Sequence, residues 1–344
     1  MGVAEFLKLL LIQETKNMEF SMHRRSVLAA GSLAALGGAF LTRPARAEST
    51  TQMLVGFSAG GSTDIVARTL CPPLGQRLGQ NIVVENRAGA SGILAAHLLL
   101  RSPADGRHLM VAPQTSTIMA QILYPDRVKY DTVRDFTPLT DLGQSPLVLV
   151  VPSGSSIHSV ADLVAQARKE PGRMTYGSGG VGTSLHIAGA LLADAGRVKM
   201  LHVPYQGEAK AVIGLLSGQL SFMFSNIFVV LPYIKQGKLR ALAVTGTDHS
   251  THLPKVPTLS SQVPVTLDAS TWYGLYAPKE LPDKVANHIV SAVWAVMGSP
   301  KVSKQLAVMG ITSSPNTPAQ FKEFLRKELA AAKAAVAQAG IAVT

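Results

Sequence analysis

Two loops of small residues, more than one hundred positions apart, form the most chemically suggestive pattern in this sequence. The first lies in residues 54–64 (LVGFSAGGSTD) and the second in residues 174–184 (MTYGSGGVGTS). Each loop follows a short apolar segment and precedes an expected helix start. A helix start leaves several backbone N–H groups unpaired and carries partial positive charge, so it can bind a carboxylate or a phosphate. The pair of loops therefore predicts a small anion held between two parts of the fold.

The loops themselves carry no cationic side chain. Residues 56–64 and 175–184 contain neither Lys nor Arg, so backbone N–H groups and hydroxyls must bind any anion placed there. Glycines allow that close approach because they lack a Cβ atom. The alternative is that both segments are only tight strand-to-helix turns. The residues expected to bind are Ala59, Gly60, Gly61 and Ser62 in the first loop, and Ser178, Gly179, Gly182 and Thr183 in the second.

Seven further residues are candidates for the same site. Asp64 stands three residues after Gly61, where a carboxylate can cap the helix start, or it contacts a hydroxyl or amino group of the ligand. His186 lies one turn into the second helix, where a structural role is favoured over a role in the cleft. Three others follow predicted strand ends, namely Thr115, Ser116 and Asn226. The last two, Phe57 and Tyr205, are expected to form apolar walls of the site, although both fit the core equally well.

The elements that must position these residues alternate along the chain. Short β-rich segments are predicted at 52–57, 82–85, 108–112, 147–151, 174–176, 200–203, 220–224, 239–244 and 271–277. Helices are predicted at 62–79, 92–101, 116–123, 160–169, 184–195, 209–217, 227–236, 283–297, 301–309 and 318–339. This alternation predicts an α/β fold with parallel sheets. Pro72 and Pro73 are expected to break or kink the first helix, since each removes a donor and clashes with the preceding turn.

The N-terminal 47 residues have the pattern of an export signal. His23-Arg24-Arg25 precedes an apolar stretch that ends before Ala45-Arg46-Ala47, a typical small-x-small cleavage sequence. The arginine pair resembles a twin-arginine signal, and a Sec signal remains equally open. The apolar stretch is shorter than the roughly 20 residues of a membrane span, which disfavours an anchor. Residues 1–21 precede a natural start at Met22, so we expect an over-long N-terminus and cleavage near Ala47, leaving a soluble periplasmic protein.

Composition narrows the classes of function. Residues 1–47 hold six Lys/Arg and three Glu, so removing them lowers the net charge from +11 to about +8. The remaining basic residues are scattered, which disfavours nucleic-acid binding. One cysteine, Cys71, excludes an internal disulfide and is expected to be a buried, unreactive side chain. No metal-ligand cluster is recognisable, and we expect neither a metal nor a cofactor.

An enzyme is the competing class. Residues 177–182 spell G-x-G-x-x-G between a strand and a helix, which is the fingerprint of a dinucleotide fold. That fold requires an acidic residue at the end of the next strand, but this strand ends in His202-Val203-Pro204-Tyr205. The sequence also lacks the P-loop and H-E-x-x-H motifs. A nucleotide-dependent α/β enzyme that uses the 177–182 loop is therefore the alternative, and no catalytic residue is predicted.

Seven ordered motifs resemble those of one receptor family. They are AGGSTDIVAR (59–68), VENRAGASG (84–92), YGSGGVGTSLH (176–186), VPYQG (203–207), GKLRALAVT (237–245), LPKVPT (253–258) and WYG (272–274). They are similar to those of the Bug (TctC-type) extracytoplasmic solute receptors of tripartite tricarboxylate transporters, and the resemblance runs in register over nearly all of residues 52–330. Ser58 and Ala88 stand where the family often has proline, and the family's first helix lacks the Pro72–Pro73 pair.

This resemblance implies a two-lobed, type II periplasmic-binding-protein fold with a ligand cleft between the lobes. It implies that residues 48–142 and 250–344 form one lobe and residues 143–249 the other. It also implies a small carboxylate ligand, delivered without chemical change to the membrane permease subunits of a tripartite tricarboxylate-type transporter by a monomeric receptor. The identity of the carboxylate, whether aliphatic, aromatic or amino acid, is not encoded in any motif.

Overall fold

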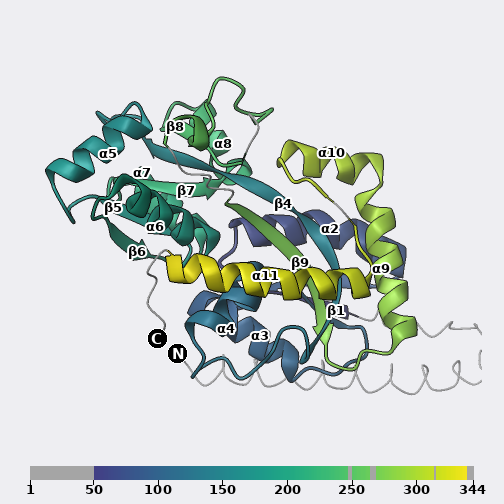
Figure 1. Ribbon diagram of the computed structural model, residues 1–344. Coiled ribbons are helices and arrows are strands. Elements are labelled where there is room, and N and C mark those ends of the chain that lie inside the picture. Colours follow the sequence, from purple (N-terminus) through teal and green to yellow (C-terminus); the bar gives the residue numbers. More distant parts are fainter. Residues whose placement is uncertain (1–49, 247–249, 264–268, 314, 339–344) are drawn as a thin grey trace, which may run out of the picture. The chain divides into compact units, whose positions relative to one another are not determined.

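The strands and helices follow the predicted alternation. A computed structural model describes residues 50–246, 250–263, 269–313 and 315–338 (Figure 1). The predicted export signal and cleavage site, and Ala339 at the end of the last predicted helix, lie outside these residues. The strands are β1 (Thr50–Val55), β2 (Asn81–Asn86), β3 (His108–Pro113), β4 (Phe136–Pro152), β5 (Thr175–Ser178), β6 (Leu201–Pro204), β7 (Phe222–Asn226), β8 (Leu239–Val244) and β9 (Ser270–Pro278).

The helices match the predicted ranges to within a few residues. They are α2 (Ser62–Leu78), α3 (Ile93–Leu100), α4 (Ala120–Leu123), α5 (Val160–Lys169), α6 (Ser184–Gly196), α7 (Glu208–Leu216), α8 (Ile227–Lys235), α9 (Asp283–Met297), α10 (Pro300–Val308) and α11 (Pro318–Gln338). Three short turns of other geometry accompany them: η1 (Ala90–Gly92), the π-type turn η2 (Thr115–Met119) and η3 (Leu259–Ser261). No helix in the described part of the chain combines the length and apolarity needed to cross a bilayer.

The sheet has two parallel parts joined by long antiparallel strands. Its strand order is β2-β1-β3-β9-β4-β7-β5-β6, and β8 also pairs with β4. Strands β1, β2 and β3 are mutually parallel, as are β5, β6 and β7, whereas β4 and β9 run antiparallel to their neighbours. The predicted parallel sheets are therefore found only at the two ends. We call the part around β1 the first half and the part around β5 the second half.

Strand β4 connects the halves and is much longer than predicted. Residues 136–146 pair with β9, and residues 147–152 pair with β7 and β8. Only the second stretch, residues 147–151, was predicted. The first contains Pro138, Gly143 and Pro146, which disfavour a regular strand, and its register shifts at two places beside them.

Helix α2 is continuous through its two prolines, contrary to the predicted break. It begins after the extended Gly61 and ends at Gly79, whose left-handed φ of 64° closes the last turn. Pro72 and Pro73 each deprive the preceding turn of one backbone donor. The helix nevertheless continues to Leu78, since Cys71 and Leu74 on either side of the prolines pack in the core.

Helix α11 runs across both halves (Figure 1). Its Phe321 and Leu325 are fully buried beside Leu54 and Tyr276 in the first half. Val336, three turns further on, packs instead with Ile187 of α6 in the second half. The helix therefore packs in the core and contributes apolar contacts to the two halves separately.

Cys71 yields a simple test of the core around α2. Its side chain is buried, and burial raises the pKa of the thiol to about 12, so the reactive thiolate is suppressed. We expect no reaction with an aromatic disulfide reagent in the native protein at pH 8 and stoichiometric reaction in denaturant, measured by absorbance of the released thiolate. Rapid labelling without denaturant would contradict the packing of this helix.

Candidate functional site

The first loop connects β1 to α2 through a turn that requires glycine. Gly60 has φ of +78°, a left-handed conformation, whereas Gly61 is extended, and the Gly61 N–H donates to the Ser58 carbonyl at 3.3 Å. Ala59 and Gly60 are exposed, but Ser62 and Thr63 at the first turn of α2 are buried. The start of α2 therefore points into the molecule, with its N-terminal N–H groups in an enclosed position.

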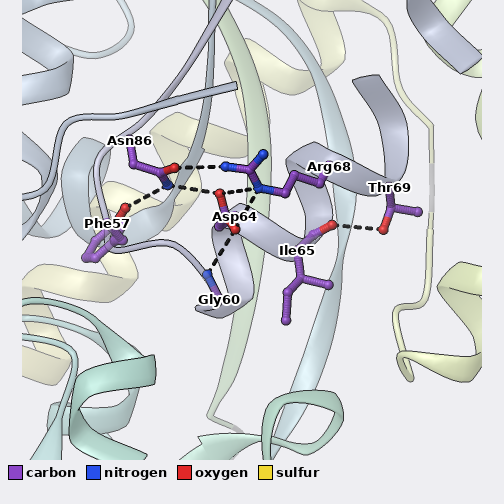
Figure 2. A network of polar contacts seen from close by, with 7 residues as sticks. All are labelled: Phe57, Gly60, Asp64, Ile65, Arg68, Thr69 and Asn86. Carbon is purple, nitrogen blue, oxygen red and sulfur yellow. Dashed lines mark hydrogen bonds and ion pairs between the residues drawn. The ribbon is translucent and has the colours of Figure 1, made fainter. Parts of the chain in front are cut away.

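Asp64 holds this loop in shape (Figure 2). Its carboxylate accepts the Gly60 N–H at 2.9 Å, the Arg68 Nε–H at 2.9 Å and the Asn86 side-chain amide at 2.9 Å. The same amide also donates to the Phe57 carbonyl at 3.0 Å. Burial alone would raise the pKa of Asp64, but these hydrogen bonds outweigh burial and lower the pKa below its usual value. Asp64 therefore reaches back to the residue before the N-cap Gly61 and holds the loop at the helix start.

The second loop connects β5 to α6 and is also held by its own side chains. The buried Ser178 hydroxyl donates to the Gly180 carbonyl at 2.9 Å and lies 2.7 Å from Nε2 of His202. Thr183 caps α6 by accepting the His186 N–H at 3.2 Å, and its hydroxyl donates to the Gly180 carbonyl at 2.8 Å. The Ser178 and Thr183 side chains thus stabilise the loop.

Two stacked histidines, the buried His186 and the half-buried His202, support the second loop. The rings of His186 and His202 stack with their centroids 3.8 Å apart, and Nδ1 of His186 accepts the Gly182 N–H at 3.1 Å. Burial lowers the pKa of His186 to about 4, and burial together with the charge of His186 lowers the pKa of His202 to about 3. Both rings are therefore neutral at pH 7, and His186 occupies the structural position favoured by the sequence.

A carboxylate that the sequence analysis did not single out lies between the two loops. Glu208, the first residue of α7, is only 5% exposed. Its Oε1 accepts the Ser225 hydroxyl and the Asn226 backbone N–H, both at 2.7 Å, and its Oε2 accepts the Ser62 N–H at 3.3 Å. The Asn226 side-chain amide donates to both oxygens, at 3.2 Å and 3.0 Å. An acidic residue in the first turn of a helix is common, so the local pattern does not reveal this role.

Three other hydrogen bonds connect the same regions. The Ser91 hydroxyl donates to the Val181 carbonyl at 2.8 Å, and the Ser184 and Thr271 hydroxyls lie 2.6 Å apart. The Tyr273 hydroxyl donates to Oδ1 of Asn226 at 3.2 Å. The Ser91 bond thus joins the first half to the second loop, and the Ser62–Glu208 bond joins the start of α2 to the second half.

A small cavity lies where the two helix starts meet, and a larger hollow lies beside it. The cavity measures about 30 Å³, close to the volume of one water molecule. The hollow measures about 240 Å³ and shares Phe57 and Gly179 with the cavity. Tyr124 and Tyr205 line the hollow, and none of its lining residues is charged.

The predicted site residues divide between lining and support. Six line the cavity, namely Phe57, Gly61, Ser62, Thr115, Gly179 and Thr183, and Tyr205 lines the hollow. The other eight border neither space, namely Ala59, Gly60, Asp64, Ser116, Ser178, Gly182, His186 and Asn226. The cavity also has six lining residues outside this set: Thr63, Pro113, Ser184, Leu185, Glu208 and Thr271.

Comparison with known proteins identifies the family. Residues 66–341 match the model of the tripartite tricarboxylate transporter family receptor. The chain belongs to this receptor family. Its members are solute-binding receptors of the periplasm, so the interpretation as a receptor is confirmed and the nucleotide-dependent enzyme is excluded.

Three solved structures are similar to this receptor. The periplasmic binding protein BugD has a TM-score of 0.81 and 26% identity over 86% of this chain and 99% of its own. The R. palustris protein Rpa4515, solved with adipate, has a TM-score of 0.82 and 28% identity over 86% and 99%. MatC from Rhodopseudomonas palustris, with bound malate, has a TM-score of 0.79 and 25% identity over 84% and 99%. The predicted fold class, that of the periplasmic binding proteins, is confirmed.

The histidine pair predicts an acid-sensitive receptor. On folding, the pKa of His186 falls from 6.5 to about 4. The contribution of its neutral ring to the free energy of unfolding is therefore fully present above pH 6.5. This contribution is lost as the pH falls from 6.5 to about 4, because the unfolded state binds the proton first; for His186 the loss is about 3 kcal/mol. Urea unfolding between pH 7.5 and pH 4.5 should show a shallower decline for His186→Gln than for the wild type.

The exposed His158 provides the matched control. His158→Gln should retain the wild-type decline, because this side chain lies on the surface. Equal pH dependence in the His186 variant and the wild type would show that the buried pair does not control acid stability.

Proposed function

We propose that this protein binds a small carboxylate between its two helix-start loops and delivers it to the membrane permease of a tripartite tricarboxylate-type transporter. The observation that carries the proposal is the shared cavity, which is lined by Ser62 and Thr63 of α2 and by Thr183 and Ser184 of α6. Two helix N-termini that face one cavity supply unpaired N–H groups and partial positive charge. The similarity to proteins solved with adipate and malate supports a carboxylate as the anion.

Recognition in this proposal is made by neutral groups. Neither the cavity nor the hollow is lined by Lys or Arg. Backbone N–H groups and the hydroxyls of Ser62, Thr115 and Thr183 would therefore bind the carboxylate, and Phe57 and Tyr205 would contact the remainder of the ligand. Such a site fixes the position of the carboxylate and leaves the length and shape of the ligand to the hollow.

Binding requires the two halves to separate. A cavity of about 30 Å³ does not admit a carboxylate of the size of malate or adipate. We propose two lobes that close by a hinge across β4 and β9. The first lobe covers residues from about 48 to 142 and the C-terminal part of the chain, and the second lobe starts near residue 143. Leu253 and Leu259 pack in the core of the second half. This packing supports a boundary at which the chain returns to the first lobe only after Leu259, later than the expected residue 250.

A screen of carboxylates tests the function directly. The screen should cover aliphatic, aromatic and amino-acid carboxylates. We expect at least one of them to raise the unfolding temperature of the exported protein, measured by differential scanning fluorimetry. At a concentration of about 100 times Kd, the ligand adds about 2.7 kcal/mol to the free energy of unfolding. A flat response across all three classes would count against a carboxylate receptor.

Gly61 offers a substitution that affects closure while sparing the fold. A Cβ at Gly61 would lie 3.3 Å from the Ser58 carbonyl oxygen and 3.9 Å from both the Ala209 nitrogen and the Glu208 Cβ, and the φ of −80° accepts any residue. The methyl groups of Gly61→Val should keep the helix start away from α7. We expect affinity, measured by calorimetry, to fall at least tenfold while the circular dichroism spectrum is retained.

Gly154→Val is the matched control for this substitution. Gly154 has no atom within 4 Å of an added Cβ, so both fold and affinity should remain at the wild-type level. Unchanged affinity in Gly61→Val would show that the start of α2 does not contact the ligand. Gly182 is less suitable, because its φ of +79° and the nearby Leu123 would strain any larger residue.

The export step and the oligomeric state belong to the same proposal. We propose cleavage after Ala47 by signal peptidase and a monomer in the periplasm. Protein purified from the periplasm of cells that express the full chain should begin at Glu48 by intact-mass analysis and elute as a monomer in light scattering. A mass that includes residues 1–47 would contradict the cleavage, and a stable dimer would contradict the monomer.

A further inference from the structure

Glu208 places a fixed negative charge in a site that we propose for an anion. The carboxylate lines the cavity, and it is the only charged group among the cavity's lining residues. Within the described residues, Glu208 forms no ion pair with a Lys or Arg. Its hydrogen-bond partners there are neutral donors of Ser62, Ser225 and Asn226. A buried carboxylate without a counter-cation is expensive unless donors surround it, so its presence in the wall requires an explanation.

The two oxygens of Glu208 are not equally well bound. Oε1 accepts three hydrogen bonds, of which those from Ser225 and the Asn226 backbone are 2.7 Å long. Oε2 accepts only the Asn226 side-chain amide at 3.0 Å and the Ser62 N–H at 3.3 Å. The second distance is long for an N–H···O bond. The Ser62 contact is the longest of the five hydrogen bonds, so Oε2, the oxygen next to the start of α2, is the one at which another donor can most readily replace an existing bond.

The ligand carboxylate would occupy the position beside this oxygen. In the proposed function the Ser62 N–H contributes to binding the ligand, so one ligand oxygen and Oε2 of Glu208 would both approach the same donor. Two carboxylates a few ångströms apart in a partly enclosed site repel each other strongly. The repulsion is relieved when a donor group of the ligand stands between them and bonds to Oε2.

We propose that Glu208 makes the receptor selective for carboxylates that carry a hydrogen-bond donor, an amino or a hydroxyl group, on the carbon adjacent to the carboxylate. This inference rests on the proposed function. A protonated amino group donates to Oε2 and also neutralises its charge, a hydroxyl only donates, and an unsubstituted carbon does neither. Affinity should therefore decrease in the order amino, hydroxyl, unsubstituted for ligands of otherwise equal shape.

Matched ligand series test the order in the wild-type protein. Calorimetry would compare alanine, lactate and propionate, then aspartate, malate and succinate, then phenylalanine, 3-phenyllactate and 3-phenylpropionate. In each series that binds, we expect the amino or hydroxyl member to bind at least tenfold more tightly than the unsubstituted member. Equal or tighter binding of the unsubstituted member would overturn the inference and leave the proposed function intact.

Glu208→Gln assigns the preference to this side chain. The variant keeps the shape but removes the charge, so the ratio of amino to unsubstituted affinity should fall at least tenfold, chiefly because the unsubstituted acid binds better. Glu170→Gln is the control, because it removes one negative charge at a side chain that is 55% exposed, and the ratio should not change. An unchanged ratio in folded Glu208→Gln would overturn the role of Glu208.

Two remaining outcomes are also decisive. If Glu208→Gln does not fold, the wild-type series alone decides the inference, since the order of affinities needs no variant. If no member of any series binds, the proposed function fails, and the inference that rests on it fails as well. Binding with no dependence on the donor group overturns the inference alone.

Discussion

The buried carboxylate of Glu208 imposes the constraint on which the site depends. A carboxylate that is 5% exposed and has no cation beside it must be surrounded by donors. In this protein the donors come from the start of α2, through Ser62, and from the end of β7, through Ser225 and Asn226. Because these segments belong to different halves of the sheet, satisfying one side chain brings the halves together. The Ser62 donor thus connects the first loop to the second half at the cavity that both helix starts line.

The side chains with the strongest chemistry in the two loops stabilise the loops themselves. Asp64, with Arg68 and Asn86, fixes the turn before α2, and the His186–His202 stack fixes the turn before α6. Their charges are neutralised or suppressed, because Arg68 pairs with Asp64 and burial lowers the pKa of both histidines. Rigid loops with neutral linings suit recognition by backbone groups, because an N–H donor that is already oriented loses little freedom on binding. In such a site the single charged residue of the lining, Glu208, has a large influence on which ligands fit.

Local patterns predicted the elements well, and tertiary contacts account for what they missed. The loops at residues 56–61 and 178–183 were predictable because small residues between a strand and a helix have a local cause. The first half of β4 was not, since Pro138 and Gly143 are tolerated there only through bulges against β9. Helix α2 continues through Pro72 and Pro73 because of core packing that no local rule includes. Glu208 was missed for the same reason: its position is that of an ordinary first-turn acid, and its partners Ser62 and Ser225 are distant in sequence.

The Ser62–Glu208 contact also sets how strongly a ligand must bind. In this structure Glu208 accepts the Ser62 N–H that the proposed ligand would use, so under the proposed hinge motion closure without a ligand leaves that donor satisfied. A ligand must displace this internal acceptor, and its apparent affinity is reduced by the fraction of receptor that is open. The contact is 3.3 Å long and is therefore a weak competitor. A strong internal bond would keep the receptor closed and unreceptive, whereas a missing acceptor would leave a buried donor unpaired on closure. A weak contact at this position satisfies both conditions, and the proposed hinge motion depends on both.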